Sequence, residues 1–159
     1  SSTWSRASGA TPGYAWDYQV DLIGYKYYMI DIIAAIALEQ MKKLPENLKF
    51  RRHVQKRYNK ELPDIMERPP HSETVQYYCS RVLHDDRDKL IDYLATKNIH
   101  TSVHFKPLHK YAPLIQNRDY PVADSEWGRF ITLPCHNRMT EEDIDYVIYW
   151  VHEYFNSKG

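Results

Sequence analysis

The pattern of apolar and polar residues predicts two consecutive helices in the first part of the chain. Residues 32–38 are apolar on every side of a helix, so this segment is expected to be buried all round. Asp31 stands where its carboxylate would accept backbone N–H groups as the N-terminal cap. The pair Leu44-Pro45 is expected to end or kink the helix, because proline cannot donate a helical hydrogen bond. A charged, half-solvated helix is then expected over residues 46–62, with an apolar side formed by Leu48, Phe50, Val54, Tyr58 and Leu62.

Short strands and helices are expected to alternate after residue 70. Residues 74–82 favour a strand. A short helix, capped by Asp85-Asp86, follows to about Lys97-Asn98 and places Leu90, Ile91 and Leu94 on one face. Residues 99–105 alternate with a period of two, which predicts a strand with a core face and a face toward a polar cleft or solvent. The core face holds Ile99, Thr101, Val103 and Phe105, and the polar face holds His100, Ser102 and His104.

The last third of the chain carries the clearest helical signal. A short helix is expected near residues 122–129, and a short strand over residues 130–133 is stopped by Pro134. Thr140 and Asp143 approximate a capping box at the start of the final helix. One apolar stripe follows on that helix, formed by Ile144, Val147, Ile148, Val151 and Phe155. The order of elements predicts an α/β fold in which a small sheet of about three strands packs against helices.

Composition and charge narrow the classes of function. The 21 basic side chains balance 21 acidic ones, which argues against a general binder of nucleic acids or anionic membranes and favours small molecules or proteins as partners. No apolar stretch approaches the length of a membrane span and the start lacks an apolar signal-peptide core, so a soluble cytoplasmic protein is expected. Cys79 and Cys135 are expected to be reduced thiols, although a disulfide between them stays possible. The 14 tyrosines favour subunit interfaces and ligand clefts.

Four blocks of sequence, in this order and spacing, resemble a known family. They are residues 24–32 (Gly-Tyr-Lys-Tyr-Tyr-Met-Ile-Asp-Ile) with the helix that follows to residue 41, residues 99–109, residues 132–134 and residues 139–148. The blocks resemble the C-terminal portion of the DegT/DnrJ/EryC1/StrS family of pyridoxal-phosphate-dependent sugar aminotransferases.

This resemblance implies a fold and a division into domains. The family has the aspartate-aminotransferase type of fold, in which a large domain holds the cofactor and a smaller C-terminal α/β domain covers one side of the cleft. Residues 1–45 would be an irregular arm and a buried helix belonging to the end of the cofactor domain, and residues 46–159 would be the small domain. The active enzyme would be a homodimer with its sites at the subunit boundary.

The resemblance also implies residues that contact the cofactor. Tyr25, Lys26 and Tyr28 would reach across the dimer to the cofactor phosphate of the partner, and ammonium, hydroxyl and helix N–H groups all suit a phosphate. The alternative is that the tyrosines pack and Lys26 is solvated. Tyr28 stands where the family usually has Arg or Asn, and Ile30 where Thr or Ser is usual, so the phosphate contact is expected to be weakened or rearranged.

The block over residues 99–109 would border the sugar-binding cleft. His104, Lys106 and His109 are the expected substrate-binding residues, with Lys106 suited to a nucleotide diphosphate or a carboxylate. One alternative is a plain pair of surface histidines. A zinc site is another alternative, but it would need a third ligand, and His100, Cys135 and His136 are not at a specific spacing.

The function implied is that of a nucleotide-sugar aminotransferase. Such an enzyme would use pyridoxal phosphate to move an amino group from an amino acid, with glutamate expected, to a ketosugar nucleotide for surface-polysaccharide or glycan synthesis. No lysine here matches the Schiff-base lysine of the family, so no catalytic residue is predicted and these 159 residues alone are not expected to transaminate. Three alternatives remain open: a dehydratase using the same cofactor, a non-catalytic dimerisation or binding module of the same family, and a small metal hydrolase.

Overall fold

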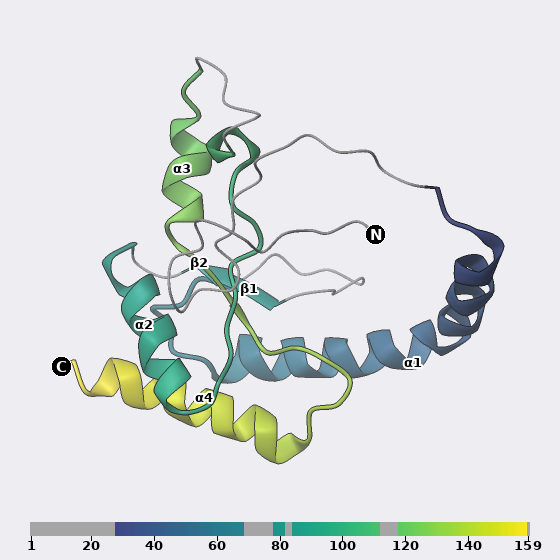
Figure 1. Ribbon diagram of the computed structural model, residues 1–159. Helices are drawn as coiled ribbons and strands as arrows, with labels where there is room; N and C mark the ends of the chain where they lie inside the picture. Colours follow the sequence, from purple (N-terminus) through teal and green to yellow (C-terminus); the bar gives the residue numbers. More distant parts are fainter. Residues whose placement is uncertain (1–27, 69–77, 82–83, 112–117, 159) are drawn as a thin grey trace.

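The computed structural model describes residues 28–68, 78–81, 84–111 and 118–158 (Figure 1). The helices and strands of these residues follow one another in a mixed α/β order. They are α1 (Asp31–Glu61), β1 (Tyr78–Arg81), α2 (His84–Thr96), the 3₁₀ turn η1 (Leu108–Lys110), α3 (Pro121–Trp127), β2 (Phe130–Leu133) and α4 (Glu141–Asn156).

The sheet of the described residues is an antiparallel pair, β1 and β2, in which Cys79 stands opposite Thr132. On the other side of β2, Ser102 forms an isolated bridge to Thr132 through two backbone hydrogen bonds, of 3.0 Å and 2.7 Å. The segment expected to be a strand over residues 99–105 is therefore extended but paired at one residue only. Ile99 and Val103 are buried as expected, whereas Phe105 is 64% exposed, so the predicted core position of Phe105 is wrong. The ladder does not continue past the bridge, and the chain turns toward η1.

The core lies where α1, α2 and α4 meet the sheet. α4 contacts both α1 and α2, and α2 also contacts β2. Tyr58 of α1 is fully buried, and its hydroxyl donates a hydrogen bond of 2.9 Å to the carbonyl of Pro134. The most deeply buried side chains come from these elements and the segments that join them: Val54, Tyr58, Met66, Leu90, Leu94, Val103, Ile131, Leu133, Ile144 and Val151.

The helix α1 differs from the sequence-based expectation in continuity and at its start. One helix runs through Pro45, and Figure 1 shows its axis changing direction between its first turns and the rest, so the kink is confirmed and an end at this point is excluded. The predicted cap by Asp31 is wrong: Ile30 is the N-cap residue, no side chain caps the helix, and Asp31 lies in the first turn.

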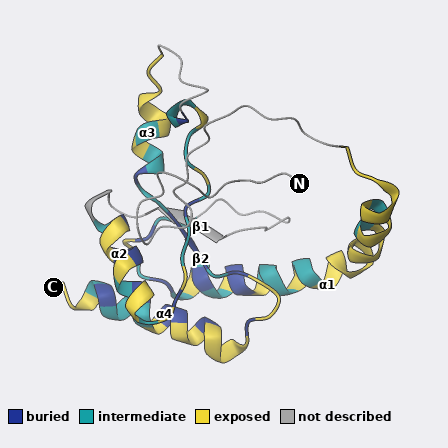
Figure 2. Cartoon of the chain, viewed as in Figure 1, coloured by how far each residue is buried: buried dark blue, intermediate teal, exposed yellow. Residues whose placement is uncertain are grey.

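The expected burial of the first half of α1 is also wrong for this chain. Ile32 is 70% exposed, and the first half of α1 is mostly exposed in Figure 2. The described part of the chain packs only against the second half of α1, which carries the buried residues Val54, Gln55 and Tyr58. An apolar face requires a cover, and the described elements do not supply it. The exposed large apolar side chains of this half are Ile32, Ile33, Ile36, Leu38, Met41 and Leu44.

The C-terminal end of α1 is capped by side chains that lie outside the helix in the sequence. The Arg68 guanidinium donates to the carbonyls of Asn59 and Leu62, and His152 of α4 lies 2.6 Å from the carbonyl of Glu61. Arg68 also donates to the carbonyls of Pro63 and Met66 in the turn that follows. The last carbonyls of a helix have no partner within it, so these contacts satisfy groups that would otherwise be left unpaired.

The later elements agree closely with their sequence patterns. The Thr140 and Asp143 side chains form a complete capping box at the start of α4. α3 and β2 lie within two residues of the expected ranges. The predicted apolar faces of α2 and α4 are buried, except that Phe155 at the end of the α4 stripe is only partly buried. α2 begins at His84, so Asp85-Asp86 lies inside the helix rather than capping it. Of the expected strand over residues 74–82, residues 78–81 form β1 and the others lie outside the described residues.

Two further observations bear on composition. Cys135 is a free, buried thiol, and burial raises its pKa to about 11. None of the described helices combines the length and apolar character needed to cross a membrane.

Candidate functional site

His104 is attached to the sheet through Thr132. The Nδ1 atom of the His104 ring lies 2.9 Å from the Thr132 hydroxyl, and the ring packs edge-on against Phe105 with centroids 4.7 Å apart. Burial lowers the pKa of His104 below its usual value, which favours the neutral ring. A neutral imidazole offers one N–H and one lone pair, which suits hydrogen bonding to a polar ligand rather than ion pairing.

His109 is held by a carboxylate from α3. Its Nε2 atom lies 2.9 Å from Oδ1 of Asp124, and Nζ of Lys110 lies 2.8 Å from the same oxygen. The hydrogen bonds that Asp124 accepts from Lys110 and then from His109 hold the pKa of its carboxyl below the usual value. The ring of His109 also packs on Tyr120, with centroids 4.8 Å apart. Because Asp124 already engages Nε2, a substrate would meet the Tyr120-flanked ring or its other nitrogen.

Lys106 lies beside the aromatic ring of Tyr111. Its Nζ atom is 5.6 Å from the centroid of the Tyr111 ring, which is a cation–π contact. Nearby in the sequence, Lys110 lies 5.3 Å from the centroid of the Trp127 ring. These two ammonium groups are charged donors on one short segment, and together they suit an anionic ligand such as a diphosphate.

A buried arginine fixes α3 relative to α2. Nη1 of Arg87 in α2 lies 3.4 Å from the carbonyls of both Trp127 and Phe130, and its guanidinium carbon is 5.7 Å from the centroid of the Trp127 ring. Arg87 is also paired with Asp88. This arrangement holds the end of α3 and the start of β2, and through α3 it supports Asp124.

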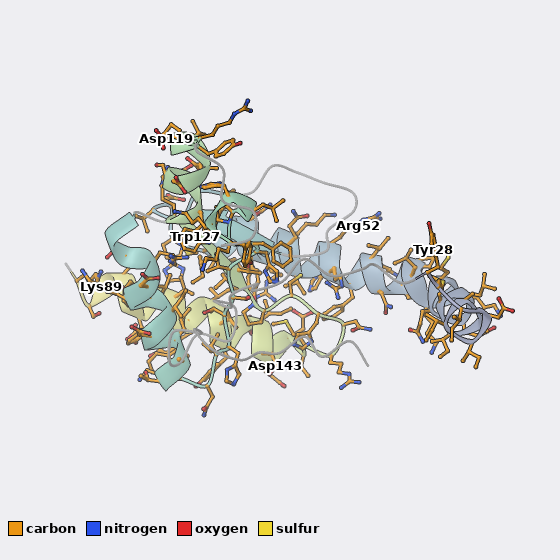
Figure 3. The ribbon with its side chains drawn as sticks, turned by 45° about the horizontal axis from the view of Figure 1, so that its top comes forward. Tyr28, Arg52, Lys89, Asp119, Trp127 and Asp143 are labelled. Carbon is orange, nitrogen blue, oxygen red and sulfur yellow. The ribbon has the colours of Figure 1, made fainter. Side chains whose placement is uncertain are left out.

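The structure does not bring the predicted cofactor residues to this region. Tyr25 and Lys26 lie outside the described residues, and Tyr28 is 97% exposed at the start of α1. Figure 3 shows Tyr28 at the far end of the molecule from Trp127. Within one chain, therefore, Tyr28 and the segment that holds His104 and His109 do not form a common site.

A metal site has no support among the described residues. They contain no group of three or more His, Cys, Asp or Glu side chains that could hold a metal ion. His109 is bonded to Asp124, and the remaining contacts of that carboxylate are with Lys110, which is not a usual metal ligand. The metal-hydrolase alternative thus has no candidate centre in this part of the chain.

Sequence reasoning did not assign roles to Thr132 and Asp124. Both lie far along the chain from the histidines they contact, with separations of 28 and 15 residues. Thr132 had one signal, its place in the short Thr-Leu-Pro block, but nothing in that block indicated a histidine partner. Asp124 lies in the first turn of a short helix, where an acidic residue is ordinary.

Comparison with known proteins gives one consistent family. The profile of the DegT/DnrJ/EryC1/StrS aminotransferase family matches residues 5–152. The spore coat polysaccharide biosynthesis protein SpsC of Bacillus subtilis is 31% identical, over 92% of this chain and 41% of that protein. The UDP-4-amino-4,6-dideoxy-N-acetyl-beta-L-altrosamine transaminase of Campylobacter jejuni is 25% identical, over 89% of this chain and 41% of that protein.

The fold agrees with the sequence comparison. The crystal structure of the aminotransferase TlmJ from Streptoalloteichus hindustanus matches with a TM-score of 0.75 and 25% identity, over 89% of this chain and 41% of that structure. The expected fold class is thereby confirmed as the C-terminal part of the pyridoxal-phosphate-dependent transferase fold. This chain spans 41% of the length of each of these three proteins.

Proposed function

Since the chain belongs to the DegT/DnrJ/EryC1/StrS aminotransferase family, we propose that it forms the C-terminal part of a nucleotide-sugar aminotransferase. The reaction moves an amino group from glutamate to a ketosugar nucleotide, and the product serves surface-polysaccharide or glycan synthesis. The observation that carries this proposal is the family match over residues 5–152. The names of the Bacillus and Campylobacter relatives, which refer to polysaccharide synthesis and to a UDP-linked amino sugar, supply the substrate class.

His104, Lys106 and His109 are the residues that we assign to the sugar nucleotide. The neutral ring of His104 hydrogen-bonds sugar hydroxyl or carbonyl oxygens, and the ammonium of Lys106 meets the diphosphate. Asp124 holds His109 in place, so this ring forms a fixed wall of the cleft. This assignment is consistent with the two cationic side chains, Lys106 and Lys110, on the same short segment.

Tyr25, Lys26 and Tyr28 are assigned to the phosphate of the cofactor in the partner subunit of a homodimer. The fit rests on Tyr28, whose exposed side chain leaves its hydroxyl available to a group outside its own subunit. Pyridoxal phosphate, when bound, supplies the electron sink for amino transfer. The residues of this chain contribute binding and orientation, and the lysine that bonds the cofactor is supplied by the part of the family fold that precedes them.

The first half of α1 supports the proposed division into domains. We assign residues 1–45 to the end of the cofactor domain and residues 46–159 to the small domain. The apolar side chains of α1 are exposed up to Leu44 and become buried only from Val54 onward. The proposed boundary near residue 45 therefore lies where the apolar side chains of α1 begin to change from exposed to buried.

The test uses the complete polypeptide that contains these residues, loaded with pyridoxal phosphate. We expect glutamate-dependent formation of an amino sugar nucleotide from a UDP- or dTDP-linked ketosugar, measured by mass spectrometry of the product. His104→Ala and His109→Ala are expected to raise the KM for the sugar nucleotide about tenfold or more. The matched control is His100→Ala, an exposed histidine of the same segment.

Two results would contradict the proposal. A folded, cofactor-loaded protein that aminates no ketosugar nucleotide would refute the transferase assignment, and a product that has lost a hydroxyl without gaining nitrogen would indicate the dehydratase. Equal effects of His100→Ala and His104→Ala would refute the assignment of the cleft.

A non-catalytic dimerisation module is the second candidate, and the exposed apolar face of α1 is the observation that favours it. In that case the face pairs with another copy of the chain. Light scattering of the isolated 159 residues separates the two candidates. A defined small oligomer with a sharp melting transition supports the module, whereas open-ended aggregation supports a domain severed from its cover.

A further inference from the structure

Thr132 has a backbone partner on each side within the sheet. Its backbone stands opposite Cys79 of β1 on one side and is bonded to Ser102 on the other. Its side chain is 5% exposed, between the buried Ile131 and Leu133. A β-branched side chain has few accessible rotamers, so the hydroxyl is held on a rigid base.

His104 lies two residues after Ser102, the residue that bridges to Thr132. The backbone bonds between Ser102 and Thr132 and the contact of His104 with the Thr132 hydroxyl therefore join the same two segments. A ring held by its backbone register and by a side-chain hydrogen bond has little freedom to turn. Such a supporting bond is what a ligand-binding side chain needs to keep its orientation.

We propose that Thr132 is a positioning residue for the sugar-nucleotide cleft: its hydroxyl donates to Nδ1 of His104 and thereby makes Nε2–H a fixed donor to a substrate oxygen. This inference rests on the proposed function for its substrate, but the contact itself does not. The nitrogen that carries the proton in a neutral histidine is set by the hydrogen bond of the other nitrogen. A threonine hydroxyl can donate to the lone pair of a ring nitrogen.

The neutral state of His104 makes this arrangement possible. A protonated ring would donate from both nitrogens, and Thr132 would then select nothing. Burial lowers the pKa of His104, which favours the form in which one lone pair remains. The substrate group recognised through Nε2–H is a hydrogen-bond acceptor: a sugar hydroxyl, a carbonyl or a phosphate oxygen.

The first experiment measures the tautomer directly in the complete polypeptide. Histidine labelled with ¹⁵N is used, and His104→Gln assigns the signals of His104. We expect a pyridine-like Nδ1 and a pyrrole-like Nε2 in the natural sequence and in Thr132→Ser, and a mixture of tautomers in Thr132→Val. A protonated Nδ1 in the natural sequence, or an unchanged spectrum in Thr132→Val, overturns the proposal.

The second experiment measures steady-state kinetics. Thr132→Val is expected to raise the KM for the sugar nucleotide about five- to tenfold, the size of one net hydrogen bond, with kcat within about twofold. Thr132→Ser is expected to restore the KM to within about twofold. An unchanged KM in Thr132→Val overturns the positioning role even where the tautomer has changed.

The matched control is Thr101→Val. The Thr101 hydroxyl is buried on the neighbouring segment and has no hydrogen-bond partner among the described residues, so the same change of chemistry is made there. We expect neither the tautomer nor the KM to change, and an equal change in both variants overturns the proposal. An enzyme without aminotransferase activity refutes the proposed function, while the tautomer measurement still decides whether Thr132 orients His104.

Discussion

The first half of α1 is the more apolar of its two halves, and yet it is the more exposed. In the first half, Leu38 is 63% exposed, whereas Leu62, which caps the second half, is 3% exposed. The second half packs against α4, and the first half extends away from the described elements (Figure 1). The difference teaches that an apolar pattern identifies which residues need cover, but does not say which part of a protein supplies it.

The largest expected effect compares Leu38, within α1, with Leu62, the C-cap residue of the same helix. In the isolated chain, Leu62→Ala should lower the free energy of unfolding by about 2–5 kcal/mol, because it leaves a cavity in the core. Leu38→Ala should change it by less than about 0.5 kcal/mol, since this side chain is largely in water. Urea unfolding measures both.

The same two substitutions, made in the complete polypeptide, test whether the first half of α1 is buried there. If the first half of α1 is covered there, Leu38→Ala becomes about as costly as Leu62→Ala. A negligible effect of Leu38→Ala in both forms would contradict the assignment of this half to a domain core.

The next largest effect is a loss of stability at the C-terminal end of α1, which packs in the core. Arg68→Ala removes the donors to the carbonyls of Asn59 and Leu62, and we expect a loss of about 1–3 kcal/mol in urea unfolding. Arg138→Ala is the control, because Arg138 is an exposed arginine of a surface turn. Equal small effects of both variants would show that water replaces Arg68 without cost.

A smaller effect separates the starts of two helices. Thr140→Ala breaks the capping box of α4 and should cost about 1 kcal/mol. Asp31→Ala should cost only a few tenths, because Asp31 lies in the first turn of α1 without capping it. Thermal melting ranks the two variants, and a larger loss for Asp31→Ala would contradict the structure.

The smallest effect is a dependence on pH. Arg57 holds the pKa of Glu61 below its ordinary value of 4.5, so this pair stabilises the fold above pH 4.5 and loses its contribution as the pH falls below it. Glu61→Gln should therefore flatten the decline in stability over that acid range. Glu39→Gln, which removes an exposed ion pair with Lys42, should leave the decline unchanged.

Local signals in the sequence predicted most of the elements that follow α1. The capping box at Thr140, the stripe of α4 and the limits of β2 are encoded by neighbouring residues, and each was found correctly. The predicted core position of Phe105 was wrong. Side chains alternate between two faces only while a strand is paired in a sheet, and the pairing of this segment stops after Ser102.

The candidate site was predictable only in part. The pattern and the resemblance selected His104 and His109, but their partners Thr132 and Asp124 come from elements that only tertiary folding brings close. No local rule links residues so far apart in the sequence. The roles of Tyr25 and Lys26 stay predictions, since both lie outside the described residues.

Pro45 weakens the mechanical coupling between the two halves of α1 and thereby affects how fast their amide hydrogens exchange. Proline has no amide hydrogen, so the carbonyl four residues before it, that of Met41, loses its helical donor, and the helix bends near this point. The ladder of helical hydrogen bonds is therefore interrupted between the two halves. In the isolated chain, we therefore expect amide hydrogens of the first half to exchange with solvent through local opening, and those around Val54 and Tyr58, which are buried, to exchange only when the core opens.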